Sequence, residues 1–135
     1  GNVLLAGDYR EFFTLGVERY GQARTWLLEY QSTTEDYQAR GRELLRAARL
    51  ADTVVVLLTN EDMAILLNEL EPVANKVIVI SALSPAHLDA LPWCKTAIAA
   101  YGTGDESMRA AFGALAAQAP GRSIGTVDQS PATQP

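Results

Sequence analysis

The chain has one cysteine, one histidine and no apolar run as long as a membrane-spanning helix. Cys94 has no second cysteine for an intramolecular disulfide, and with His87 it supplies too few ligands for a zinc site. No segment approaches the ~20 apolar residues needed to cross a bilayer. We therefore expect a soluble domain without a metal, a cofactor or a membrane span, and the cysteine content leaves its compartment open.

A basic surface is missing as well. The net charge is −5, and nucleic-acid binding draws most of its affinity from clustered Lys and Arg. Arg40, Arg42, Arg46 and Arg49 fall on one predicted helix, where helical spacing spreads them over its solvent side. We therefore expect no nucleic-acid partner.

What the chain does contain is enough apolar sequence for one packed domain. It has 135 residues, of which 48% are hydrophobic and 20% charged, a composition typical of globular domains. It begins at Gly1 and enters an apolar segment almost at once. We expect a domain cut from, or processed out of, a longer product.

Five short β-rich segments alternate with segments of helical periodicity. The predicted strands span residues 3–6, 25–30, 53–58, 76–80 and 96–100. The third and fourth are apolar without alternation, as expected for strands covered on both faces. These two strands belong in the middle of a sheet.

The first two predicted helices have clear ends and faces. Phe13, Val17 and Tyr20 share one face of the first helix, and Gly21 is placed to end it. The second helix begins at a capping box formed by Ser32 and Glu35. Its apolar stripe then faces the sheet and consists of Tyr37, Gly41, Leu44, Leu45 and Ala48.

Three later helices are also marked by their caps. Asn60 is predicted to cap a helix that ends before Pro72. Ser84 and Pro85 begin a single helical turn. The last helix starts at a box formed by Thr103 and Glu106, and its apolar positions run through Met108, Ala111, Phe112, Leu115, Ala116 and Ala119.

This alternation predicts an α/β fold. We expect a three-layer sandwich in which a mainly parallel sheet of five or six strands, in a flavodoxin-like order, carries helices on both faces. Residues 121–127 are predicted to form an edge strand or a docking arm. Residues 1–127 are expected to form a single domain, and the polar segment 128–135 a flexible C-terminal tail.

In such a sheet, ligands bind beyond the carboxyl ends of the strands. The side chains that follow these strand ends are the candidate substrate-binding residues: Asp8, Thr59, Asn60, Glu61, Ser81, Ser84 and His87. The loops contain neither a GxGxxG pattern nor a Walker A sequence, which excludes the usual dinucleotide and nucleotide sites. A phospho-receiver would need an aspartate where Thr59 stands.

No catalytic residue is predicted. Ser81, Ser84, His87 and Asp89 are close in sequence, but no GxSxG elbow surrounds either serine, and capping or surface positions explain them better. Glu61 and Asp62 complement the positive end of a helix better than they suit acid–base work. Cys94 is expected to pack near a strand start.

Several short segments, in a fixed order, resemble a known family. They are Asp52-Thr53-Val54-Val55-Val56 with Thr59 and Asn60, Val77-Ile78-Val79-Ile80, Ser84-Pro85 with Leu88, Ala99-Ala100-Tyr101-Gly102, and Gly121-Arg122. Together they resemble the C-terminal α/β domain of family 3 glycoside hydrolases and are most similar to the bacterial β-N-acetylglucosaminidase branch. The resemblance spans roughly residues 3–127. It departs from the family at Ala86 and His87, where Tyr and Asp are favoured, and at residues 123–125, where Leu-Pro-Val is favoured.

The resemblance implies a domain without catalytic residues of its own. In the N-acetylglucosaminidase branch the nucleophilic aspartate and the acid–base group belong to a separate barrel domain. In the β-glucosidase branch a glutamate at the end of the third strand donates the proton; here that position is nearest Thr59, with Glu61 two residues later. The implied partners are a catalytic barrel, in the same or a companion chain, and a carbohydrate, with the parent enzyme in the bacterial cytoplasm or exported.

Two other hypotheses stay open at this point. The chain is alternatively a free-standing flavodoxin-like module that binds a small ligand or another protein. A self-sufficient hydrolase is the third reading. An exposed apolar surface away from the strand ends would favour the accessory domain, and a closed polar pocket at the strand ends would favour the binding module.

Overall fold

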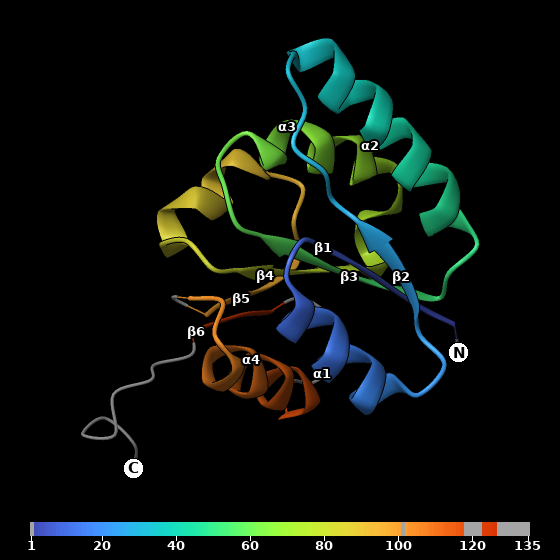
Figure 1. Ribbon diagram of the computed structural model, residues 1–135. Coiled ribbons are helices and arrows are strands. Elements are labelled where there is room, and N and C mark those ends of the chain that lie inside the picture. The colour runs from blue at the N-terminus through green and yellow to red at the C-terminus, as the bar shows by residue number, and fades with distance from the viewer. Residues whose placement is uncertain (1, 101, 118–122, 127–135) are drawn as a thin grey trace.

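The computed structural model describes residues 2–100, 102–117 and 123–126 (Figure 1). Its six strands form one sheet in the order β2-β1-β3-β4-β5-β6, and every neighbouring pair is parallel. The first five follow the 2-1-3-4-5 order of flavodoxin-like folds, so the predicted fold class is confirmed. The strands are β1 (Val3–Gly7), β2 (Arg24–Leu27), β3 (Thr53–Leu58), β4 (Val77–Ser81), β5 (Thr96–Ala99) and β6 (Ser123–Thr126).

Helices cover both faces of this sheet. The pair α1 and α4 lies on one face, and α2 and α3 lie on the other (Figure 1). The helical elements are α1 (Arg10–Tyr20), α2 (Thr34–Arg49), α3 (Met63–Leu67), α4 (Asp105–Ala117) and the 3-10 helices η1 (Asn68–Lys76) and η2 (Pro85–Ala90). The result is the three-layer arrangement expected from the sequence.

The central strands are buried on both sides. In β3, Val54 and Val56 pack with the α2–α3 layer, whereas Val55 and Leu57 pack with the α1–α4 layer. All four side chains are fully buried. An apolar run without alternation is the sequence pattern that such a strand requires.

One predicted segment ends differently in the structure, and another takes the first of its two predicted forms. The second strand was predicted to span 25–30 but ends at Leu27, and Tyr30 lies in the following loop. The edge strand predicted within 121–127 is confirmed as β6, whereas the predicted tail 128–135 lies outside the described residues. The assignment of 1–127 to a single domain stays a prediction.

The buried face of α1 differs from the predicted one. Phe12, Leu15 and Gly16 are buried, while Val17 is 37% exposed. A Cβ on Gly16 would lie 2.5 Å from Leu5 Cδ1, so the helix approaches the sheet at a glycine. A hydrophobicity pattern that counts only large side chains overlooks that contact. The end of the helix was predicted correctly, since Gly21 has φ 69° and its N–H donates to the carbonyl of Val17 at 2.7 Å.

The cap of α2 is one residue later than predicted. The Thr33 hydroxyl accepts a hydrogen bond from the Asp36 amide at 3.0 Å, so Thr33, and not Ser32, begins this helix. The two registers are hard to distinguish in the sequence, because Ser32 and Thr33 are adjacent and each is followed three positions later by an acidic residue. The stripe containing Tyr37, Gly41 and Leu44 is buried as predicted.

The later helices follow their predicted caps in part. Asn60 Oδ1 accepts from the Met63 amide at 3.0 Å, which confirms the cap before α3. The chain then continues as η1, which contains Pro72 instead of ending before it. The last helix begins at Asp105, so Gly104 and not Thr103 precedes it; the Gly104 carbonyl accepts from the Met108 amide at 3.0 Å.

Candidate binding rim

The loops that follow the strands at their carboxyl ends form one edge of the sheet, which we call the strand-end rim: residues 8–9, 28–32, 59–62, 82–84 and 102–104. Because β1, β3 and β4 are neighbours in the sheet, the loops that follow these three strands are neighbours as well. This topology brings together side chains that are 51 positions apart in one case and 26 in another. Two hydrogen-bonded groups result.

Asp8 and Thr59 form the first group. The Thr59 hydroxyl lies 3.0 Å from Asp8 Oδ1 and 2.8 Å from Asp8 Oδ2, so it donates to the carboxylate between its two oxygens. Partial burial raises the pKa of Asp8, and the hydrogen bond from Thr59 opposes that rise. The Thr59 hydroxyl therefore holds the Asp8 carboxylate in place, while burial disfavours its charged form.

Ser84, His87 and Glu61 form the second group. Ser84 Oγ lies 3.0 Å from His87 Nδ1, and His87 Nε2 lies 2.9 Å from Glu61 Oε1. His87 stands in η2, Ser84 caps it, and Glu61 comes from the loop after β3. The sequence placed all three among the candidates but treated Ser84 and Glu61 as residues of separate helix starts. The structure joins them through the imidazole.

A cavity of about 320 Å³ lies beside this second group. Glu61 and His87 supply its polar side chains, and the remaining lining is small or aliphatic. That lining consists of Leu58, Ala64, Ala86 and Ala90. The volume is near the lower limit of the pockets that hold small molecules.

Two other candidates have local structural roles. Asn60 caps the turn that leads into α3. Ser81 is fully buried, and its Oγ lies 3.3 Å from the amide of Leu83 and 3.4 Å from its carbonyl oxygen, closing the turn after β4. A ligand at the rim surface would not reach the Ser81 side chain.

Large exposed side chains at the rim were not among the predicted site residues. Tyr9 is 40% exposed, Leu27 52% and Tyr30 76%. They follow or end β1 and β2, which are paired through Gly7 and Leu27. Tyr30 was predicted as the last residue of a strand, but the strand ends at Leu27, which leaves Tyr30 in the following loop. Exposed apolar side chains stand both at the rim and away from it, where Leu50 is 73% exposed.

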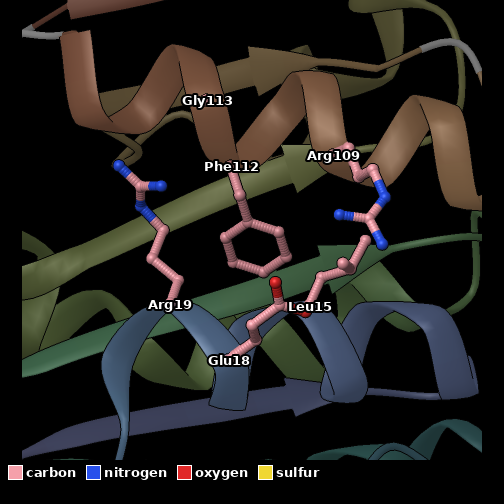
Figure 2. A pocket seen from close by; sticks show the side chains of 6 residues that line it. All are labelled: Leu15, Glu18, Arg19, Arg109, Phe112 and Gly113. Atoms are coloured by element: carbon pink, nitrogen blue, oxygen red, sulfur yellow. The ribbon is translucent and has the colours of Figure 1, made fainter.

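A second cavity, of about 290 Å³, lies away from the rim between α1 and α4. Figure 2 shows Phe112 pointing from α4 toward α1, with Arg19 and Arg109 on either side of it. Arg109 Nε donates to Asp105 Oδ2 at 2.9 Å, and this bond raises the pKa of the Arg109 guanidinium. Glu18 also lines the cavity and is a further acidic neighbour of Arg109.

Among the described residues, no three His, Cys, Asp or Glu side chains are grouped so that they could hold a metal ion. No helix among them has the length and hydropathy of a membrane span. Burial raises the pKa of the Cys94 thiol, and Cys94 Sγ donates to the carbonyl of Thr96 at 3.3 Å, which suits a packing residue better than a nucleophile.

No protein-family model, no curated protein and no solved structure matches this chain. Its function is therefore argued from its own residues and from the order of its motifs. The rim is the part of the described structure where polar, titratable and exposed aromatic side chains meet. It is the candidate functional site.

Proposed function

We propose that the chain is an accessory domain of a glycan-cleaving hydrolase of the family 3 type. In this proposal it packs on a separate catalytic barrel and turns its strand-end rim toward the sugar cleft. The support is the motif order, which resembles the C-terminal domain of the β-N-acetylglucosaminidase branch, together with an α/β fold of the kind that this resemblance implies. Fold by itself does not assign a function, so the proposal depends on the side chains of the rim.

The observation that carries the proposal is the combination of side chains at the rim. Sugars present hydroxyl groups that both donate and accept, and ring faces of C–H groups that pack on aromatic rings. Asp8, Thr59 and Glu61 offer acceptors and a hydroxyl at adjacent strand ends, and Tyr9 and Tyr30 offer exposed rings. This mixture suits a neutral, hydroxyl-rich ligand better than an anion.

The proposal assigns no glycosidic step to this chain. A retaining glycosidase with two carboxyl groups needs them about 5 Å apart across the bond. At the rim, Asp8 and Glu61 stand in separate hydrogen-bonded groups, with Thr59 and with His87. The nucleophile and the proton donor are then groups of the barrel, and Leu27 and Tyr30 are candidates for the contact with it.

The experiment has two arms. The chain is assayed with aryl N-acetylglucosaminide, and its amide NMR spectrum is titrated with N-acetylglucosamine oligomers. We expect no turnover, and shift changes confined to loops 8–9, 28–32 and 59–62. The titration is repeated with Thr59→Val, which should weaken binding, and with Leu50→Ala, an exposed position outside the rim, which should not.

Reading the coding sequence before Gly1 tests the accessory role directly. A barrel-length region with a nucleophilic aspartate is the expected result. Robust glycoside turnover by this chain alone, or a start codon immediately before Gly1, would contradict the proposal.

The cavity beside His87 favours a second candidate, a free-standing module that binds a small ligand. Its volume of about 320 Å³ and its mixed lining suit a compact molecule with one polar end. A thermal-shift screen separates the candidates, because a ligand that binds only the folded chain raises its Tm, by an amount that grows with the logarithm of the ligand concentration divided by its Kd. This module would be favoured by three results together. A small ligand binds tightly, Ala90→Leu abolishes that binding, and the coding sequence contains no barrel.

A further inference from the structure

Two serines follow β4, and their surroundings differ. Ser81 is buried and bonded to its own turn. Ser84 is exposed, and its Oγ lies 3.0 Å from His87 Nδ1. Of the two hydroxyls, the Ser84 hydroxyl alone is both open to solvent and in contact with a basic side chain.

The contact with Glu61 serves to assign the tautomer of a neutral His87 ring. The ionised Glu61 carboxylate only accepts, so the hydrogen of a neutral His87 ring is assigned to Nε2, which lies 2.9 Å from Glu61 Oε1. Nδ1 then presents a lone pair, and the Ser84 hydroxyl donates to it. This is the arrangement in which a histidine removes a proton from a serine.

The same geometry accommodates the histidine after it has taken that proton. The backbone carbonyl oxygen of Ser84 lies 3.3 Å from His87 Nδ1. A protonated Nδ1 therefore has an acceptor other than Oγ, which leaves Oγ free to form a bond. On the other side of the ring, Glu61 stabilises the positive charge of the imidazolium.

We propose that Ser84 is a nucleophile that accepts acyl groups from small activated esters. Oγ attacks the carbonyl carbon while its proton passes to His87 Nδ1, and the ester's alcohol leaves with that proton. The product is an acyl ester on Ser84. Water then attacks this ester with His87 again as the base, which releases the carboxylic acid and restores the serine. The roles match a Ser-His-acid triad with the two ring nitrogens exchanged.

The cavity beside His87 limits the class of ester. Ser84 does not line this cavity, but its Oγ lies 3.0 Å from Nδ1 of His87, which does. Alanines 64, 86 and 90 and Leu58 line it together with the polar pair. A space of about 320 Å³ with these short side chains suits an acetyl or propionyl ester of a phenol better than a long-chain lipid ester. This activity goes beyond the accessory role and requires no barrel.

The test is acylation of the chain by p-nitrophenyl acetate, followed by release of nitrophenol and by peptide mass spectrometry. We expect one acetyl group, on Ser84, and none on Thr14, whose exposed hydroxyl lies in α1 outside the rim. Ser84→Ala should abolish the burst, and Thr14→Ala should leave its rate unchanged. His87→Ala should slow acylation by a factor of about 10² or more.

Two further measurements separate chemistry from folding. Added imidazole should restore part of the rate in His87→Ala, which a purely structural role would not allow. Glu61→Gln should slow acylation less than His87→Ala while the amide NMR spectrum stays folded. Acetyl groups spread over several side chains, or an unchanged rate in folded His87→Ala, would overturn the proposal. Sugar binding and glycoside turnover are independent of this result, so the two proposals can fail separately.

Discussion

The two halves of the rim hold their polar side chains in opposite ways. The Asp8–Thr59 half sits directly on adjacent strands β1 and β3, and burial disfavours its charge. The Ser84–His87–Glu61 half links two loops, and its side chains are more open: the Glu61 side chain is 77% exposed and that of His87 31%. The first half is therefore tied to stability. The side chains of the second half are more accessible to a ligand, which suits chemistry.

The largest expected effect comes from altering the strand end beneath the first half. A Cβ on Gly7 would lie 2.6 Å from Phe12 Cδ2 and 3.2 Å from Leu57 Cβ. Gly7→Ala should lower the free energy of unfolding by about 2–3 kcal/mol, the usual range for overpacking. Urea unfolding measures this change.

Gly113→Ala serves as the matched control. Nothing lies within 4 Å of a Cβ built there, and the residue is exposed in α4. The substitution should raise stability by up to about 1 kcal/mol through helix propensity. Equal losses of stability in Gly7→Ala and Gly113→Ala would show that the surroundings of Gly7 are no more tightly packed than those of Gly113.

Thr59→Val should have the next largest effect. It removes the donor to Asp8, which raises the pKa of that carboxyl further. At neutral pH we expect a loss of about 1 kcal/mol, which is below the range of about 1.5–3 kcal/mol for hydrogen bonds to charged groups, because the pair is only partly buried. In acid, where Asp8 is protonated, the loss should shrink. Chemical unfolding at pH 7 and at pH 3 compares the two.

Asp8→Asn tests the first half of the rim through the pH dependence of the free energy of unfolding. The folded pKa of Asp8 is raised by burial, so the carboxyl favours folding below its unfolded pKa, and this contribution is lost as the pH rises through the folded pKa. The variant should therefore match the wild type in acid and be at least as stable at neutral pH. The opposite result would be a variant that is as stable as the wild type at pH 3 but less stable than the wild type at pH 7. It would mean that the charge of Asp8 itself stabilises the fold.

Glu61→Gln should have the smallest effect on stability. The side chain is largely exposed, and exposed ion pairs contribute from about 0 to 1 kcal/mol. We expect the thermal midpoint to move little, while the acylation rate of Ser84 falls. A large loss of stability would place the second half among the structural contacts of the fold and remove the contrast between the halves.

Much of the fold was predictable from local patterns. The runs at β3 and β4 are apolar because both faces of these strands are covered, and that requirement is visible residue by residue. Gly21 and Asn60 mark helix ends because the backbone groups they satisfy are their near neighbours in the chain. The errors arose where two registers were equally good, as at Ser32 and Thr33.

The candidate site was predictable only as a set of loops. The rule that ligands bind at the carboxyl ends of parallel strands selected Asp8, Thr59, Ser84 and His87. Which of them meet depends on contacts across more than 20 positions, such as Glu61 with His87 and Asp8 with Thr59. Side-chain burial separated Ser81 from Ser84, although both belong to the same short segment.

The amino-acid sequence by itself determined the alternation of strands and helices, the central position of β3 and β4 and the edge of the sheet where polar side chains gather. These features depend on hydrophobic periodicity and on caps, which act between residues close in the chain. Only the tertiary structure decided that His87 lies between Ser84 and Glu61, and that α1 meets the sheet at Gly16. Such contacts depend on strand order and on the packing of whole elements against one another, and neither is encoded in any one short segment.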